Sequence, residues 1–348
     1  MNKKFISIIW GYHKQIFSFD KKQNYHMLPI EAMQEEGFEC EIFAIDSQVK
    51  IEDDPNFIAG TKVIYYKGFL DYLIYLFKNR NAIIYSNSLT IKTLLVGIIG
   101  KKTVFMAHDQ VFPLENKKIK QLIVKFFYRF FSFIRVINKG ESELLNKLNI
   151  NNKILPLSIS DNFLNTDFIN RRGGIFIGNL YADKNPEFLI IVMKEIIKKY
   201  PDFILKIAGE DRYNKNGLKF SDIINNEGLS KNILILGFIP HNRLKNLLSE
   251  SLIYINTSIS EGQCLAVYEA SLSGCILCLQ NILSFPSVLG KNALYHSIED
   301  ELIKNIDTIL KGNFDYININ KENQKMILEK YNYDYIKSET KKMFLQLN

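Results

Sequence analysis

Residues 252–279 read LIYINTSISEGQCLAVYEASLSGCILCL, and this stretch has the pattern of a strand, a loop, a helix and a second strand. Its first segment, Leu252–Ile255, and its last, Cys275–Leu279, are short apolar runs typical of strands covered on both faces. Between them, apolar residues at helical spacing begin near Leu265 and stop at Gly274, which is typical of a helix end. A strand–helix–strand unit predicts an α/β fold with a parallel sheet.

Two carboxylates lie in the loop and helix of this stretch. Glu261 and Glu269 are eight residues apart, and Gly262 directly follows the first of them. We expect both to face the helix N-terminus, where unpaired N–H groups and the positive end of the helix dipole favour a phosphate. The alternative is two surface glutamates on an ordinary helix.

The stretch resembles the Glu-x7-Glu signature of retaining, GT-B-fold glycosyltransferases of family 4, the glycosyl transferases group 1 type. Three residues depart from that pattern, because Thr257 replaces a proline, Gln263 an aromatic residue and Cys264 a glycine. The residues that match in register are Ser258, Glu261, Gly262, Leu265, Glu269, Ala270 and Gly274. The resemblance implies two Rossmann-like, doubly wound parallel-sheet domains that face a cleft.

Composition agrees with two globular domains of ordinary size. The chain has 348 residues, of which 47% are apolar and 23% charged. Residues 1–172 hold 24 lysines and arginines against 17 acidic residues, whereas residues 173–348 hold 20 of each. A basic first half indicates an anionic acceptor or surface. The sequence has no basic run interleaved with glycine and aromatic residues, the pattern typical of an RNA-binding motif, so we do not expect a nucleic-acid partner. The four cysteines form no disulfide framework, and Cys275 and Cys278 are interpreted as buried thiols.

The first half alternates strands and helices, which predicts a domain over residues 1–165. The expected strands are Phe5–Trp10, Glu39–Ile45, Lys62–Tyr66, Ala82–Tyr85 and Thr103–Ala107. Gly11 follows the first strand, where a glycine allows close backbone approach to a nucleotide. His108 follows the strand that ends at Ala107, and the resemblance implies that it faces the donor sugar; a turn histidine is the alternative.

After an expected linker at residues 162–173, strands and helices alternate again. This alternation predicts a second domain over 173–330, which the resemblance identifies as the nucleotide-sugar-binding one. The resemblance implies that Lys184 binds the donor diphosphate, with Asn179 standing where the family has an arginine. It also implies that the backbone at Gly237 and Phe238 contacts the nucleobase. The last helix, 334–348, is expected to pack back on the first domain.

The resemblance assigns roles to the central stretch as well. Glu261 would orient the hydroxyls of the donor sugar and Glu269 would hold the ribose. The N–H groups of the helix start would face the phosphates together with Lys184. The donor-binding set is completed by Ser260, Gly262, Gln263, Cys264 and Leu265.

The sequence thus predicts a retaining glycosyltransferase that takes a sugar from a nucleotide-diphosphate sugar to a glycan or lipid-linked acceptor, in bacterial surface polysaccharide or glycolipid synthesis. It contains no Asp-x-Asp motif, so we expect transfer without a metal and without a further cofactor. The alternatives are a nucleotide-sugar epimerase of the same fold and a non-catalytic nucleotide-sugar-binding subunit. We expect a cytoplasmic protein, because the apolar run at Phe5–Trp10 is too short for a signal segment.

One helix, over residues 117–131, is a candidate for peripheral membrane contact. Its apolar residues recur at helical spacing, and five basic residues with no acidic one lie between Asn116 and Ser132. This pattern is compatible with peripheral contact with an anionic leaflet on the inner face of the cell membrane. A helix that buries its apolar stripe in the core and solvates its basic face is the alternative.

Overall fold

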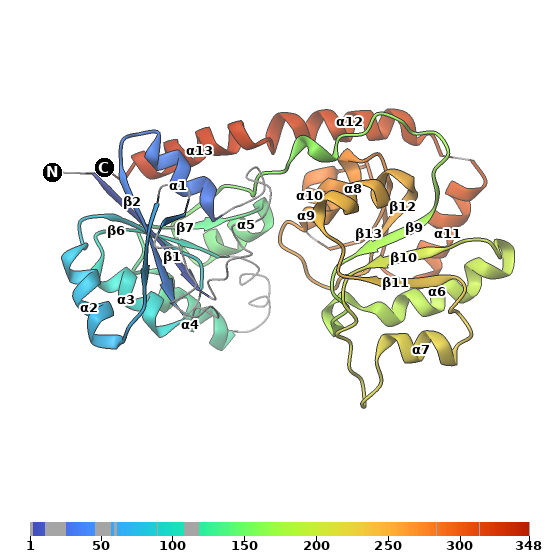
Figure 1. Ribbon diagram of the computed structural model, residues 1–348, viewed down its shortest axis with the longest axis horizontal. Coiled ribbons are helices and arrows are strands. Elements are labelled where there is room, and N and C mark those ends of the chain that lie inside the picture. Colours follow the sequence, from blue (N-terminus) through green and yellow to red (C-terminus); the bar gives the residue numbers. More distant parts are fainter. Residues whose placement is uncertain are drawn as a thin grey trace. The chain divides into compact units, whose positions relative to one another are not determined.

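The computed structural model describes residues 3–10, 26–45, 57–58, 61–88, 90–107, 118–282, 284–312 and 314–347. The chain divides into two compact units, each built around a sheet whose strands are mostly or entirely parallel (Figure 1). Unit 1 is Met1–Ser158 together with Tyr331–Asn348, and unit 2 is Ile159–Lys330.

Unit 1 alternates strands and helices along most of its length. In chain order the elements are β1 (Lys4–Trp10), α1 (Met27–Gln34), β2 (Glu39–Ile45), β3 (Phe57–Ile58), β4 (Thr61–Tyr65), α2 (Phe69–Lys78), β5 (Ile83–Ser86), α3 (Ile91–Ile99), β6 (Lys102–Met106), α4 (Lys118–Tyr128), β7 (Phe133–Val136), α5 (Lys139–Lys147), β8 (Asn152–Ile154) and, from the chain's end, α13 (Tyr333–Leu345). The described strands form one sheet in the order β3-β4-β2-β1-β5-β6-β7-β8, and all pairs except β3 with β4 are parallel.

The core of unit 1 explains why its strands are continuous apolar runs. In β1, every residue from Phe5 to Ile9 is buried, because helices cover both faces of a parallel sheet. On one face, side chains of α2, α3, α4 and α5 pack on the strands in a single cluster. On the other, α1 contacts α13, and the Phe344 ring meets the Phe5 ring edge-on at 4.9 Å. The chain's last helix is therefore an integral part of unit 1.

Unit 2 repeats the design. Its elements are a 3-10 turn η5 (Asp161–Phe163), β9 (Arg172–Ile177), a 3-10 turn η6 (Ala182–Lys184), α6 (Pro186–Lys199), β10 (Leu205–Ala208), α7 (Phe220–Asn226), β11 (Ile233–Gly237), α8 (His241–Glu250), β12 (Ser251–Asn256), α9 (Leu265–Leu272), β13 (Ile276–Gln280), α10 (Ser284–Leu289), β14 (Leu294–His296), α11 (Glu299–Leu310) and α12 (Tyr316–Lys330). The sheet order is β11-β10-β9-β12-β13-β14, with every pair parallel. Cys275, just before β13, and Cys278, within it, are fully buried, as interpreted from the sequence.

The residues expected to form a linker, 162–173, lie inside unit 2 instead. The boundary falls between Ser158 and Ile159, and β9 begins at Arg172. The buried guanidinium of Arg171 donates from Nη1 to the carbonyls of Leu248 and Ser251, each at 3.2 Å. This segment is held by side-chain bonds to backbone rather than by an apolar pattern, so its sequence lacks the periodicity of a packed element.

His296, the last residue of β14, should make stability depend on pH. Its side chain is 1% exposed and its ring lies 5.5 Å from that of Phe188. Burial lowers its pKa to about 4, although the nearby Glu301 carboxylate opposes the shift. Between pH 6.5 and 4 the unfolded chain therefore binds a proton that the folded chain excludes, and folding stability falls as the pH falls.

We expect His296 to account for a loss of about 2 kcal/mol between pH 7 and about pH 5. Urea unfolding of the wild type and of His296→Gln, followed by circular dichroism at both pH values, measures this contribution. The variant should show a shallower loss than the wild type. Parallel losses in the two proteins would show that His296 does not titrate as described.

Candidate functional site

The candidate site lies where the strands of unit 2 end. Because β9 to β12 are parallel, the loops that follow them emerge at one edge of the sheet. From β9 the chain runs outward through β10 to β11 and then crosses to the other side of β9 to form β12. Open α/β sheets bind ligands at such a switch point, beyond the carboxyl ends of the strands. The loops after β9 and β12 carry Lys184 and Glu261, respectively.

Lys184 and Glu261 form an ion pair at this switch point. Lys184 Nζ lies 2.5 Å from Glu261 Oε1, and the two side chains are only 22% and 10% exposed. The backbones of the two loops are also joined, because Thr257 Oγ1 donates to the Lys184 carbonyl at 2.7 Å and Ile259 N donates to the Asp183 carbonyl at 3.0 Å. Partial burial alone would lower the pKa of Lys184, but the Glu261 carboxylate outweighs it and raises that pKa. The lysine therefore keeps its positive charge at neutral pH.

The loop after β12 ends in a strained residue that begins α9. Cys264 adopts a left-handed conformation (φ 50°, ψ 77°) at the N-cap of α9, and its Sγ lies 3.8 Å from Asn256 Nδ2. A residue other than glycine pays a steric penalty there, which accounts for the glycine at this position in the resembling family. Burial raises the pKa of the Cys264 thiol, so it stays protonated. Gly262 and Gln263 are buried beside it, whereas Ser260 is exposed and Leu265 opens the helix.

Glu269 lies in the second turn of α9 and pairs with a histidine that sequence reasoning did not assign to the site. His241 Nε2 lies 3.0 Å from Glu269 Oε1, and the Phe163 ring packs edge-on against His241 with the ring centroids 4.8 Å apart. The Glu269 side chain is only 6% exposed. His241 begins α8, directly after the loop that follows β11, so its place at a strand end was the signal that could have found it.

The remaining predicted residues of unit 2 lie at the ends of neighbouring strands and in the loops that follow them. Asn179 Oδ1 accepts a hydrogen bond from Glu210 N at 2.9 Å, so this side chain ties the loop after β9 to the loop after β10. Those loops touch at Gly209, where an added Cβ would lie 2.0 Å from the Gly178 carbonyl oxygen. Gly237 ends β11 with φ +69°, and Phe238 after it is 70% exposed.

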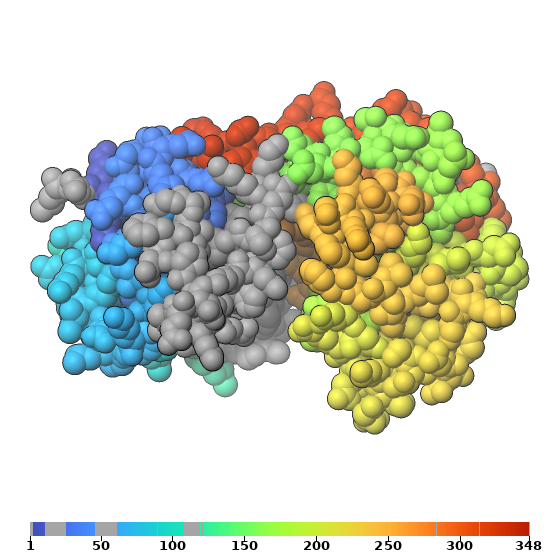
Figure 2. Space-filling view, viewed as in Figure 1, coloured from blue at the N-terminus to red at the C-terminus, as the bar shows by residue number. Residues whose placement is uncertain are grey.

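Two predicted residues, Gly11 and His108, lie outside the described residues, so their roles remain predictions. Across the described ranges, no cluster of three or more histidine, cysteine, aspartate or glutamate side chains has the arrangement of a metal site. The orange segment that includes α8 and α9 reaches the surface of unit 2 in Figure 2. The structure thus brings Lys184 together with Glu261, and Glu269 together with His241.

Solved structures identify the class of fold. Anabaena Alr3699/HepE, solved in complex with UDP, matches 99% of this chain and 100% of its own with a TM-score of 0.75 at 12% identity. Sucrose-phosphate synthase from Thermosynechococcus elongatus matches 99% of both chains with a TM-score of 0.73 at 14% identity. The predicted fold class, the two Rossmann-like parallel-sheet units of GT-B glycosyltransferases, is confirmed.

The family match identifies unit 2 more closely. Residues 171–331 match the model of the family described as Glycosyl transferases group 1, so unit 2 is a domain of that type, as its Glu-x7-Glu stretch predicted. A phosphatidylinositol N-acetylglucosaminyltransferase subunit from Homo sapiens is 26% identical over 120 residues, 34% of this chain. The UDP-Gal:alpha-D-GlcNAc-diphosphoundecaprenol alpha-1,3-galactosyltransferase of Escherichia coli is 29% identical over 150 residues, 42% of this chain. These matches span only 24% and 35% of the relatives' lengths.

Proposed function

We propose that the protein transfers a sugar from a nucleotide-diphosphate sugar to an acceptor, with retention of configuration at the transferred carbon. The observation that carries this proposal is the Lys184–Glu261 pair at the switch point of a glycosyl transferases group 1 domain. A cation, a carboxylate and a helix N-terminus then lie within one loop system, which is the charge pattern that a sugar diphosphate requires.

Departure of the nucleoside diphosphate leaves negative charge on the phosphates and positive character on the sugar. Lys184 and the N–H groups at the start of α9 stabilise the negative charge on the phosphates, because fixed positive charge in a partly buried site acts strongly on developing negative charge. We propose that, when the donor binds, Lys184 pairs with its phosphates instead of with Glu261. The Glu261 carboxylate can then accept hydrogen bonds from the sugar hydroxyls. Transfer without a metal is part of this proposal, because Lys184 supplies the charge that a divalent cation would otherwise provide.

Glu269 holds the ribose hydroxyls in this proposal, and His241 fixes the orientation of its carboxylate. Phe163 in turn restricts the His241 ring. The nucleobase lies near Gly237 and Phe238, whose exposed ring is available for stacking. We take uridine as the first base to test, because the related fold of Alr3699/HepE was solved with UDP.

We further infer that the acceptor is a glycan or lipid-linked sugar used in bacterial surface polysaccharide or glycolipid synthesis, reached from the cytoplasmic face of the membrane. The Escherichia coli relative supports this, because its name gives a diphosphoundecaprenol-linked sugar as its substrate. Peripheral contact through residues 117–131 would bring the protein to such an acceptor.

Thermal unfolding in the presence of UDP-, GDP-, ADP-, CMP- and dTDP-sugars tests the donor site. One nucleotide class should stabilise the protein, by about 2.7 kcal/mol when the donor reaches about 100 times its dissociation constant. Incubation of that donor with a diphosphate-lipid-linked sugar should then release nucleoside diphosphate and form a glycoside. Absence of stabilisation by every donor would oppose the proposal.

The strained Cys264 and the missing arginine at Asn179 favour one competing function, a subunit that binds a nucleotide sugar without transferring it. Stabilisation by a donor with no transfer across a broad acceptor panel would favour that function. Conversion of the donor into its epimer, with no new glycoside, would indicate an epimerase.

A further inference from the structure

Helix α4 turns its apolar stripe toward solvent. The exposed fractions are 76% for Ile119, 68% for Leu122, 59% for Ile123 and 50% for Phe126. The core contacts come from another side of the helix, through Val124, Phe127 and Tyr128. The alternative interpretation of the sequence, in which this stripe packs into the core, is therefore wrong for these four residues.

Cations flank the exposed stripe. Lys125 and Arg129 are exposed, and the Arg129 guanidinium lies 4.4 Å from the centre of the Phe126 ring. No acidic residue occurs in α4, and Lys125 makes no ion pair within the part of the chain that the structure describes. An apolar stripe with uncompensated positive charge beside it is complementary to a bilayer with anionic headgroups.

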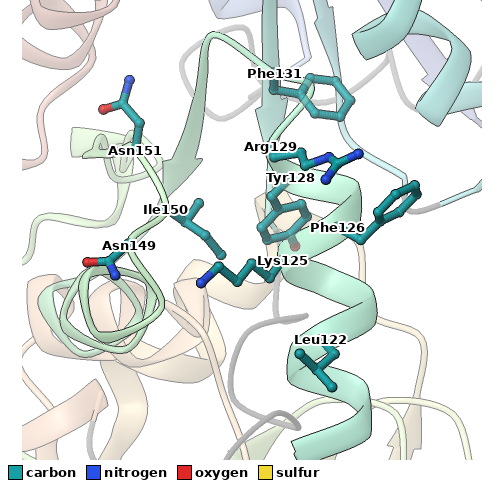
Figure 3. A pocket seen from close by; sticks show the side chains of 9 residues that line it. All are labelled: Leu122, Lys125, Phe126, Tyr128, Arg129, Phe131, Asn149, Ile150 and Asn151. Atoms are coloured by element: carbon teal, nitrogen blue, oxygen red, sulfur yellow. The ribbon is translucent and has the colours of Figure 1, made fainter.

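A pocket of about 460 Å³ opens beside this stripe (Figure 3). One wall is α4, and the other is the segment Asn149–Asn151 that precedes β8. Figure 3 shows the Lys125 side chain reaching from α4 toward Ile150 and Asn149. The Tyr128 hydroxyl next to it is buried, and it has no hydrogen-bond partner among the described residues.

The position of the pocket separates it from transfer chemistry. Asn149–Asn151 lie where β8 begins, whereas open parallel sheets bind their substrates where strands end. The pocket therefore offers a cation, amide groups and apolar walls at the edge of unit 1 opposite to the one where a substrate would bind.

Two neighbouring helices widen the apolar face. In α2, Leu70 and Phe77 are 70% and 57% exposed, and in α3, Ile91 and Ile98 are 78% and 53% exposed. The helices lie together, because α2 contacts α3, and a Cβ added at Gly97 of α3 would lie 2.9 Å from Phe130 at the end of α4. Soluble monomers rarely expose so many large apolar side chains on one group of helices.

We propose that the outer face of α2, α3 and α4, here called the docking face, lies on an anionic bilayer, and that the pocket receives the phosphate of a lipid headgroup. The inference deepens the membrane contact proposed above and rests on it, but not on the transfer reaction. Within the described residues, every helix is too short or too polar to span a bilayer.

Vesicle sedimentation tests this proposal with the full chain. Wild type should sediment with vesicles of phosphatidylcholine and phosphatidylglycerol, weakly with phosphatidylcholine alone, and less as salt is raised. Lys125→Gln with Arg129→Gln should lower the bound-to-free ratio about 30-fold, and Leu122→Ser with Phe126→Ser should lower it at least as much. The matched control is Ile191→Ser with Ile298→Ser, because these unit 2 side chains are 50% and 53% exposed.

Sedimentation equal to that of the wild type in both docking-face variants, or equal binding to neutral and anionic vesicles, would overturn the proposal. Soluble glycerol phosphate that alone releases the protein from vesicles would overturn the bilayer as the source of the phosphate. A dimer in solution that the Leu122→Ser, Phe126→Ser variant dissociates would instead assign the face to a second copy. Donor-induced stabilisation, measured on the same samples, reports on the transferase proposal separately, and far-ultraviolet circular dichroism verifies that the variants fold.

Discussion

Lys184→Ala is expected to lower kcat for sugar transfer by about 10²- to 10³-fold, the range observed when a preorganised electrostatic group is removed from an active site. Lys184 is the cation that the loop after β9 contributes to the switch point, where it lies 2.5 Å from Glu261. Without it, the negative charge of the departing diphosphate loses one of the two groups proposed to stabilise it, and the N-terminus of α9 remains. A steady-state assay of nucleoside diphosphate release measures the effect.

The experiment must distinguish a direct loss of catalysis in Lys184→Ala from a loss caused by destabilisation of the fold. Removing Lys184 leaves the Glu261 carboxylate, 10% exposed, without its cation, and an unpaired buried charge destabilises a fold. Lys184→Met combined with Glu261→Gln removes both charges and tests for folding by thermal unfolding. Lys206→Ala is the matched control, because Lys206 also pairs with a glutamate of unit 2, Glu250, at 3.3 Å. Wild-type kcat in Lys184→Ala would assign the phosphate clamp to other residues.

Glu269→Ala is expected to weaken donor binding by about 10- to 150-fold, because hydrogen bonds to a charged group contribute about 1.5–3 kcal/mol. The ribose is distant from the reacting carbon, so its contacts stabilise ground state and transition state alike, and KM should rise more than kcat falls. Isothermal titration of the preferred nucleotide diphosphate gives the affinity directly.

Two further variants sharpen this second test. Glu195→Ala removes an exposed glutamate of α6 that pairs with Lys198 and should leave donor affinity unchanged. His241→Gln keeps a hydrogen-bonding group opposite Glu269 and should weaken binding less than Glu269→Ala does. Donor affinity that is unchanged in Glu269→Ala would remove the ribose assignment and leave the His241–Glu269 pair a structural contact.

The elements whose signals are local in sequence were predicted well. β2 spans Glu39–Ile45 as its apolar run indicated, and α9 begins at Leu265 and ends two residues before Gly274. Continuous apolar runs indicate strands buried on both faces, and Gly274, at φ +84°, adopts the left-handed turn that ends a helix. The glycosyl transferases group 1 type of unit 2 could also be predicted from the sequence, because Glu261, Gly262 and Glu269 lie within one short stretch.

The two residue pairs of the candidate site could not be predicted from local sequence patterns. Lys184 and Glu261 are 77 residues apart, and His241 and Glu269 are 28 apart. Each pair meets only because of the order in which the strands of unit 2 join their sheet. The linker at 162–173 was predicted wrongly for a related reason, since Arg171 is held by carbonyls of Leu248 and Ser251 that no local pattern reveals.

By itself, the sequence determined the α/β class, most strands and helices, and the chemistry of the stretch around Glu261, because each depends on residues close together in the chain. Tertiary structure alone decided which side of α4 meets the sheet and which charges meet at the strand ends. Helical periodicity indicates that Ile119, Leu122, Ile123 and Phe126 share one side of a helix, and it is the same whether that side faces the core or the solvent. Only the packing of Val124, Phe127 and Tyr128 against the strands turned that stripe outward.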